Sequence, residues 1–315
     1  MQFNTFAIGV TASAALFAQL APQPQFNPPD TVEFHNVDIY SEGTRMHGET
    51  FIAKDRVGQK RPCIVMAHGW GGTTANLRRD ALAFAQAGYF VTGFDYRGWA
   101  TSDARVVLTK PAPAGKSGGR FTAEVQEVRG VVDPVDMGTD WLNAIHWVAA
   151  EPQCDMTKLG LWGSSFSGGL VIYAAARDKR VKAVHSQVGS MDGRVGFTSD
   201  ATYKEGTRYA RGEQVYPEPY KKAVGNLIGA PMSARFLQYF PVEEVNLAPQ
   251  AAMQFVVAGS EELFDNKDHG VRAYESFKGV KRFVNIPNIK HYGIYSEAHD
   301  QALKLALEWF GMHLK

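Results

Sequence analysis

Residues 160–169 limit what this chain can fold into more than any other segment, and they read GLWGSSFSGG. An apolar strand is expected to end at Gly163, and an apolar, alanine-rich helix is expected to start just after Ser165. A strand that turns sharply into a helix, with a serine at the bend, has the form of a nucleophile elbow, G-x-S-x-G, with Ser167 at the last position. Small residues allow strand and helix to pass close together. The segment therefore predicts an accessible Ser165 hydroxyl at the end of a sheet strand.

Strands and helices alternate along most of the chain, which predicts an α/β fold with a mostly parallel central sheet and helices on both faces. The expected strands are 31–40, 46–53, 62–67, 89–95, 158–162, 181–187, 253–258 and 282–286. The expected helices are 74–87, 134–150, 167–176 and 294–313. The first two strands form a hairpin, whereas residues 106–119 are expected to be a loop.

One long segment, residues 189–249, does not fit the alternation. It is too rich in tyrosine and phenylalanine to be disordered, and long insertions in compact domains are usually functional. We expect a mostly helical cap, or lid, over the active site, inserted into a core of residues 31–188 and 250–315; the alternative is an extra core layer away from the chemistry. Residues 1–30 are expected to be an apolar segment followed by a proline-rich linker.

The charge is balanced, with 33 basic and 32 acidic residues, so nucleic acid is not a favoured partner. The two cysteines, Cys63 in an apolar strand and Cys154 in a short loop, predict neither a disulfide framework nor a metal cluster. The nine histidines are scattered and no H-E-x-x-H pattern occurs. We therefore expect no metal, no cofactor and a small-molecule partner.

The N-terminal segment is ambiguous. Residues 6–20 are mostly apolar, but no lysine or arginine precedes Arg45, and a secretory signal needs a positive start. The run is also too short and interrupted to span a membrane. These features favour a retained segment in a cytoplasmic protein; the alternative is a secreted or periplasmic protein with residues 1–21 as a signal peptide. Self-association to a homo-oligomer is left open.

A serine nucleophile needs a base, and the best candidate is His291. It follows the last expected strand, 282–286, in a loop that precedes the last helix. Parallel sheets of this kind carry their sites at the carboxyl ends of strands, where Ser165 is also expected.

The base needs a carboxylate that orients it, and the loop after strand 253–258 offers several. Glu262 is favoured and Asp265 is the alternative, because the orienting group usually falls a few residues past its strand. Glu261 is interpreted as a solvated neighbour.

An oxyanion needs two backbone N–H donors. One is expected from Phe166, directly after the nucleophile, and the other from the glycine-rich turn 68–72, with Trp70 first and Gly71 second. Four aromatic residues are expected to line the substrate pocket, namely Trp70, Phe166, Tyr239 and Phe240.

Taken in order, four motifs resemble those of the α/β-hydrolase superfamily: HGWGG at 68–72, DYRG at 95–98, GSSFSGG at 163–169 and HYG at 291–293. The resemblance runs from about residue 31 to residue 315. Within the superfamily the chain looks like small dienelactone-hydrolase-like and peptidase-like enzymes, through residues 131–136 and 261–265. It is also similar to the fungal polyketide transferase family, through residues 168–169 and 186–188.

The resemblance implies a cofactor-free serine hydrolase that cleaves a carboxylic ester, thioester or amide through an acyl-enzyme on Ser165. One alternative keeps the same serine but makes the protein an acyltransferase or thioesterase. Another is a non-catalytic ligand-binding protein on a hydrolase scaffold, because this fold hosts many functions.

Overall fold

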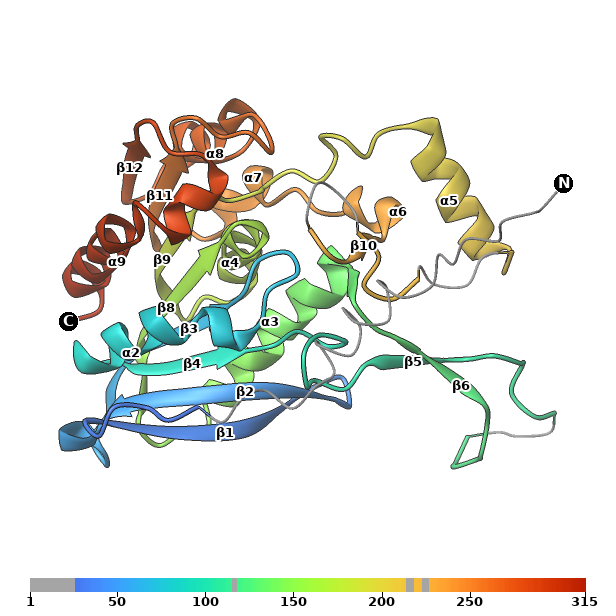
Figure 1. Cartoon of the computed structure of the whole chain (residues 1–315), viewed down its shortest axis with the longest axis horizontal. Coiled ribbons are helices and arrows are strands. Elements are labelled where there is room, and N and C mark those ends of the chain that lie inside the picture. The colour runs from blue at the N-terminus through green and yellow to red at the C-terminus, as the bar shows by residue number, and fades with distance from the viewer. Residues whose placement is uncertain (1–25, 115–117, 214–217, 223–226) are drawn as a thin grey trace, which may run out of the picture.

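The computed structural model describes residues 26–114, 118–213, 218–222 and 227–315. At its centre lies one eight-stranded sheet (Figure 1). In spatial order its strands are β1 (Val32–Ser41), β2 (Thr44–Ala53), β4 (Phe90–Phe94), β3 (Arg61–Ala67), β8 (Cys154–Ser164), β9 (Val181–Gln187), β11 (Ala252–Ala258) and β12 (Lys281–Ile286). Strand β2 runs antiparallel to β1 and β4, and the remaining neighbours are parallel. The predicted mostly parallel sheet is confirmed.

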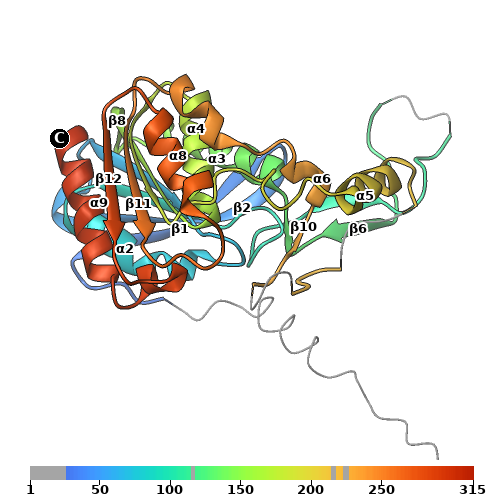
Figure 2. The same ribbon diagram turned by 90° about the horizontal axis from the view of Figure 1, so that it is seen from above.

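Helices cover both faces of this sheet. Helices α2 (Arg78–Gln86) and α9 (His299–His313) pack on one face, where Phe84 and Phe310 belong to a shared apolar cluster. Helices α3 (Pro134–Val148), α4 (Phe166–Arg177) and α8 (Gly270–Ser276) pack on the other. Figure 2 shows α8 and α9 on opposite sides of β11 and β12. Buried apolar side chains on both faces hold the carboxyl ends of the parallel strands in place.

The start of α3 follows directly from its sequence. Asp133 is the N-cap, and its Oδ1 accepts hydrogen bonds from the backbone N–H groups of Val135 at 3.0 Å and Asp136 at 3.3 Å. Pro134 occupies the first helical position, where no N–H is needed.

Three expected elements differ from the structure. The expected helix 74–87 is divided into a 3₁₀ turn, η2 (Thr74–Asn76), and α2. The last helix begins only at His299, because residues 291–295 form another 3₁₀ turn, η5 (His291–Tyr295). Part of the expected loop 106–119 is a strand: β5 (Arg105–Leu108) pairs with β6 (Val125–Val128) in a ribbon that projects from the body (Figure 1).

The expectation that the two cysteines carry no disulfide is wrong. Cys63 and Cys154 form a disulfide with Cα atoms 5.5 Å apart. They lie on β3 and β8, which are adjacent in the sheet although the two cysteines are 91 residues apart in sequence. The order of strands in the sheet, which the sequence pattern does not reveal, brings the two thiols together.

The insertion 189–249 contains mainly helices, with one short strand. Its described elements are α5 (Asp200–Ala210), β10 (Ala230–Pro231), α6 (Ser233–Phe236), α7 (Pro241–Glu244) and η3 (Val245–Leu247). Strand β10 pairs in parallel with β7 (Val131–Val132), which fixes this part of the insertion to the core. Helix α5 lies at the side of the molecule (Figure 1). That the insertion acts as a cap stays a prediction.

The remaining short elements are η1 (Lys54–Arg56) and η4 (Asn266–Asp268). Among the described helices, none combines the length and the apolar character that crossing a membrane requires. The predicted N-terminal apolar segment and the first half of its linker lie outside the described residues.

Candidate active site

The bend between β8 and α4 places Ser165 in a backbone conformation that few residues adopt. Its φ is 58° and its ψ is −126°. The conformation is held from both sides, because Ser165 N–H donates to the Gln187 carbonyl at 3.0 Å and the Ser165 carbonyl accepts from Gly168 N–H at 2.8 Å. Strained non-glycine residues of this kind gather at functional sites, where surrounding structure enforces them.

The imidazole of His291 lies beside the Ser165 hydroxyl. His291 Nε2 is 2.9 Å from Ser165 Oγ, and His291 Nδ1 is 2.8 Å from Glu261 Oε2. The Glu261 carboxylate accepts the Nδ1 proton, so Nε2 carries a lone pair that faces the serine. This is the tautomer that a general base acting on Ser165 requires. The structure therefore brings together the predicted serine and histidine, 126 residues apart.

The carboxylate beside His291 is Glu261, not the expected Glu262. The Glu261 side chain is 2% exposed, and its Oε1 also accepts from Leu263 N–H at 3.0 Å. Glu262 Oε2 instead accepts from the backbone N–H of His291 at 2.7 Å, so it braces the histidine's backbone and not its ring. The alternative, Asp265, caps η4 through a bond from Lys267 N–H at 2.9 Å.

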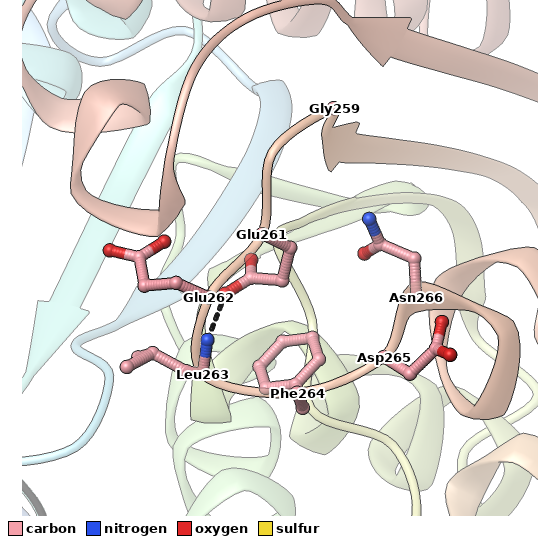
Figure 3. Close-up of a pocket in the computed structure, with 7 residues that line it drawn as sticks. All are labelled: Gly259, Glu261, Glu262, Leu263, Phe264, Asp265 and Asn266. Carbon is pink, nitrogen blue, oxygen red and sulfur yellow. Dashed lines mark hydrogen bonds between the residues drawn. The ribbon is translucent and has the colours of Figure 1, made fainter.

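Figure 3 shows how the loop after Gly259 presents its acidic side chains. The side chains of Glu261, Glu262 and Asp265 leave the loop after Gly259 in different directions. Both adjacent carboxylates contact His291, but Glu261 meets its ring and Glu262 its backbone N–H. The path of this loop, and not the composition of the segment, selects Glu261.

The glycine-rich turn 68–72 lies directly against the nucleophile. A Cβ at Gly69 would be 2.9 Å from the Ser165 Cβ. The turn is fixed by a bond from Trp70 Nε1 to the Gly229 carbonyl at 3.1 Å. Phe166 is the first residue of α4, so its N–H has no carbonyl four residues earlier within the helix. The predicted donors, Trp70 or Gly71 and Phe166, thus lie on segments that adjoin Ser165.

A cavity of about 370 Å³ opens beside Ser165 and His291. One part of its wall is apolar, with Trp70, Leu77, Trp162 and Leu227, and another part is polar. The polar side chains apart from the serine and histidine pair are those of His68, Asn76, Asp80, Ser164, Tyr292 and Tyr295. Of the four aromatic residues expected to line the pocket, Trp70 alone has its side chain in this wall.

The other expected pocket residues do not line the cavity. Phe166 is buried against Trp70, with ring centroids 5.8 Å apart. Tyr239 is buried and donates from its hydroxyl to the Ser190 carbonyl at 2.8 Å, whereas the Phe240 ring lies under the Arg194 guanidinium. These aromatic residues belong to the packing of the insertion against α4 and its neighbours.

Behind the glycine-rich turn, Asp95 is a buried structural group. It accepts from Thr74 N–H at 2.6 Å and from the Thr74 hydroxyl at 3.1 Å. Burial raises the pKa of Asp95 to about 7 and lowers the pKa of the neighbouring His68 to about 4. Arg97 pairs with buried Asp140, with Nε 2.6 Å from Oδ1. Both Asp95 and Arg97 stabilise the turn that follows β4.

Within the described ranges, no group of three or more histidine, cysteine, aspartate or glutamate side chains converges in a way that could hold a metal ion.

Comparison with known proteins gives a family and a fold. Residues 15–223 match the family model described as acetyl xylan esterase (AXE1). An Escherichia coli protein described as an uncharacterized 31.7 kDa protein in the traX-finO intergenic region is 26% identical over 288 residues, which cover 81% of this chain and 92% of that protein. Polyketide transferase claH of Penicillium crustosum is 19% identical over 322 residues, covering 89% of this chain and 96% of claH.

Solved structures share the fold at low sequence identity. Hypothetical protein PA2218 from Pseudomonas aeruginosa matches with a TM-score of 0.71 and 18% identity, over 94% of this chain and 99% of that one. The α/β hydrolase GrgF from Penicillium matches with a TM-score of 0.70 and 18% identity, over 90% and 99%. A dienelactone hydrolase from Klebsiella pneumoniae has a TM-score of 0.58 and 13% identity, over 90% of this chain and 99% of that one. The α/β-hydrolase fold predicted from the sequence is confirmed.

Proposed function

The chain belongs to the acetyl xylan esterase (AXE1) family, and from this premise we propose that it is a serine hydrolase that cleaves a carboxylic ester through an acyl-enzyme on Ser165. The observation that carries the proposal is the continuous hydrogen-bonded series from Ser165 Oγ through His291 to Glu261. A serine, a correctly oriented imidazole and a buried carboxylate are the parts that acyl transfer at neutral pH needs.

In the proposed first step, Ser165 Oγ attacks the ester carbonyl carbon while His291 Nε2 takes the hydroxyl proton. The carbonyl π electrons move to oxygen, and the N–H groups of Phe166 and Trp70 stabilise the resulting oxyanion. When the intermediate collapses, the C–O bond to the alcohol breaks and His291 donates its proton to the leaving oxygen. Glu261 keeps the imidazole oriented and stabilises its charged form throughout.

In the second step a water replaces the alcohol. His291 takes one water proton as the oxygen attacks the acyl carbon, and it returns that proton to Ser165 Oγ when the carboxylic acid leaves. The products are one alcohol and one acid, and no redox change or cofactor is needed.

The wall of the cavity supports a small substrate with polar groups. Its volume of about 370 Å³ is at the lower end of ligand pockets, which span ~300–1,000 Å³. Tyr239 and Phe240, two of the aromatic residues expected to line the pocket, do not line it. A short acyl group is therefore proposed, in agreement with the acetyl esters that the family's description names.

A second candidate function uses the same acyl-enzyme but transfers the acyl group to an acceptor other than water. The match to polyketide transferase claH over 89% of the chain favours this candidate over a non-catalytic scaffold. Mass spectrometry of products formed from a thioester donor, with and without an added alcohol, separates transfer from hydrolysis.

The primary test is Ser165→Ala, assayed with 4-nitrophenyl acetate. We expect kcat to fall by ~10⁴–10⁶-fold, because the nucleophile and its general base act as one unit. Ser296→Ala, at an exposed serine close to the same histidine, is the matched control and should keep wild-type turnover. Circular dichroism and thermal melting check that both variants fold.

A fluorophosphonate probe gives an independent readout. It should add its mass to Ser165 in the wild-type protein and in the Ser296→Ala control, and not in Ser165→Ala. Full turnover in folded Ser165→Ala would reject the proposed mechanism.

A further inference from the structure

A series of buried polar side chains runs from the core to the wall of the active-site cavity, and the proposed mechanism does not use it. The series consists of Gln254, His185, Gln187 and Ser164, each at most 3% exposed. It ends at Tyr295, which lines the cavity together with Ser165 and His291. Buried polar groups are costly unless they are hydrogen-bonded, and apart from the Gln254 Oε1 atom, which has no partner among the described residues, the series is connected throughout.

The direction of the hydrogen bonds is set at the inner end. The amide nitrogen of Gln254 lies 3.1 Å from the Leu305 carbonyl, which can only accept, and 2.9 Å from His185 Nδ1. A nitrogen that donates to Nδ1 requires His185 to carry its proton on Nε2. Burial lowers the pKa of His185 to about 4. The ring is therefore neutral at pH 7 and carries its single proton on Nε2.

The same direction continues outward. His185 Nε2–H donates to Gln187 Oε1 at 3.0 Å, and Gln187 Nε2 donates to Ser164 Oγ at 3.2 Å. Ser164 then donates its own proton to the Tyr295 hydroxyl oxygen at 2.7 Å. The phenol of Tyr295 therefore accepts from inside the protein and keeps its own proton for an acceptor on the cavity side, where the Ser165 side chain is the neighbour that it meets.

The Tyr295 hydroxyl remains a donor at neutral pH. The residue is 43% exposed as a whole, but the hydroxyl end is enclosed, and this burial raises the pKa of Tyr295 to about 12. Tyr295 and His291 lie on the same 3₁₀ turn, η5, so the position of the phenol is linked to that of the base.

We propose that Tyr295 is a specificity-determining residue: its hydroxyl donates a hydrogen bond to a second oxygen of the substrate, beside the ester that is cleaved. The preferred substrates are then esters with an ether, hydroxyl or carbonyl oxygen a few bonds from the scissile carbonyl. The inference rests on the proposed function, since it takes Ser165 as the nucleophile. A site built to donate to a substrate oxygen discriminates against the analogue that lacks it, because the donor is then left unpaired.

The test uses pairs of esters that differ by one oxygen in place of a methylene group. In the acyl pair, 4-nitrophenyl methoxyacetate is compared with 4-nitrophenyl butyrate; in the alcohol pair, 2-methoxyethyl acetate is compared with butyl acetate. For each pair the ratio of kcat/KM in wild type is divided by the ratio in Tyr295→Phe, which cancels the intrinsic reactivity of the esters. We expect a value of about 10 for at least one pair, with the methylene analogue changed less than about twofold.

Two further variants separate hydrogen bonding from packing. Tyr292→Phe removes the hydroxyl of another tyrosine of the same cavity wall, one that has no place in the buried series, and should leave both ratios unchanged. Ser164→Ala removes the group that orients the Tyr295 proton and should lower the same ratio as Tyr295→Phe, by a smaller factor. Ser164→Ala also tests the inference if Tyr295→Phe does not fold.

The inference is overturned if wild type and Tyr295→Phe have the same ratios in both pairs, or if Tyr295→Phe slows both members of each pair equally. Failure of the proposed function looks different: Ser165→Ala would then keep the turnover of all four esters.

Discussion

The two halves of the proposed catalytic site, the bend at Ser165 and the loop that carries Glu261, are built in opposite ways. The bend at Ser165 is surrounded by close backbone contacts: a Cβ at Gly163 would lie 2.3 Å from the Ser167 carbonyl oxygen, and one at Gly168 would lie 2.8 Å from the Gly189 Cα. The loop that supplies the carboxylate, residues 259–266, is mostly exposed and has acidic side chains at 261, 262 and 265. The close contacts at the bend leave room for one backbone conformation. The loop, in contrast, presents several carboxylates for the single role of orienting His291.

This difference explains how the nucleophile and the acid can be recognised. A tight bend needs a particular order of small residues around its serine, so its identity is local. An orienting carboxylate needs only to reach His291 Nδ1, and any neighbouring acidic residue on the correct side of the loop satisfies that need. We therefore expect substitutions of the acidic residues in the loop to have specific effects on catalysis, and substitutions of the glycines at the bend to affect folding.

Among the substitutions that compare these two regions, the largest effect is predicted for Glu261→Gln, with a loss of ~10⁴-fold in kcat. The amide can donate to Nδ1 and so favour the wrong tautomer of His291, which leaves no lone pair for the Ser165 proton. Steady-state hydrolysis of 4-nitrophenyl acetate measures this loss.

Glu262→Gln is the matched control, because it changes an adjacent carboxylate that contacts only the backbone N–H of His291. The amide oxygen can still accept that bond, so a loss of less than ~10-fold is expected. Reversed results for Glu261 and Glu262 would mean that the loop takes another path in the working enzyme.

The next effect is on stability and compares two glycines. Gly163→Ala should lower the free energy of unfolding by ~3 kcal/mol or more, because its methyl group meets backbone atoms that cannot move aside. Gly259→Ala, at the start of the acid loop, has its closest contacts at 3.0 Å and should cost at most ~1 kcal/mol. Urea denaturation measures both values, and equal losses would remove the contrast between the two regions.

The smallest effect concerns the buried carboxyl group of Asp95, behind the glycine-rich turn 68–72. The pKa of Asp95 is raised to about 7 from an ordinary value of 3.8, so the folded protein holds this proton more tightly than the unfolded chain does. Its stabilising contribution is present below pH 3.8 and is lost as the pH rises toward 7. Asp95→Asn removes the titration and should gain up to ~2 kcal/mol relative to wild type between pH 5 and pH 8.

Denaturation of wild type and Asp95→Asn at pH 5 and at pH 8 measures the predicted gain in stability. Asp265→Asn, on the exposed acid loop, is the control and should show no such gain. Parallel pH profiles for wild type and Asp95→Asn would indicate that His47 and Thr74 already stabilise the charge of the Asp95 carboxyl group in full, despite the opposing Glu49 carboxylate.

Sequence by itself determined the parts of this protein that depend on short-range order. Neighbouring residues predict three such parts: the strand, bend and helix around Ser165, the N-cap of α3 at Asp133, and the alternation of strands and helices that produces a parallel sheet. They can do so because periodicity and small-residue spacing act over a few positions. The position of His291 after the last strand followed from the same reasoning.

Tertiary structure alone decided what depends on which surfaces meet. It selected Glu261 over Glu262, joined Cys63 to Cys154 across adjacent strands and kept Tyr239 and Phe240 out of the cavity. Each of these outcomes is set by the path of a loop or the order of strands, which arises from packing between segments far apart in the chain. A pattern of neighbouring residues carries no information about such distances, so these features could be read only from the folded molecule.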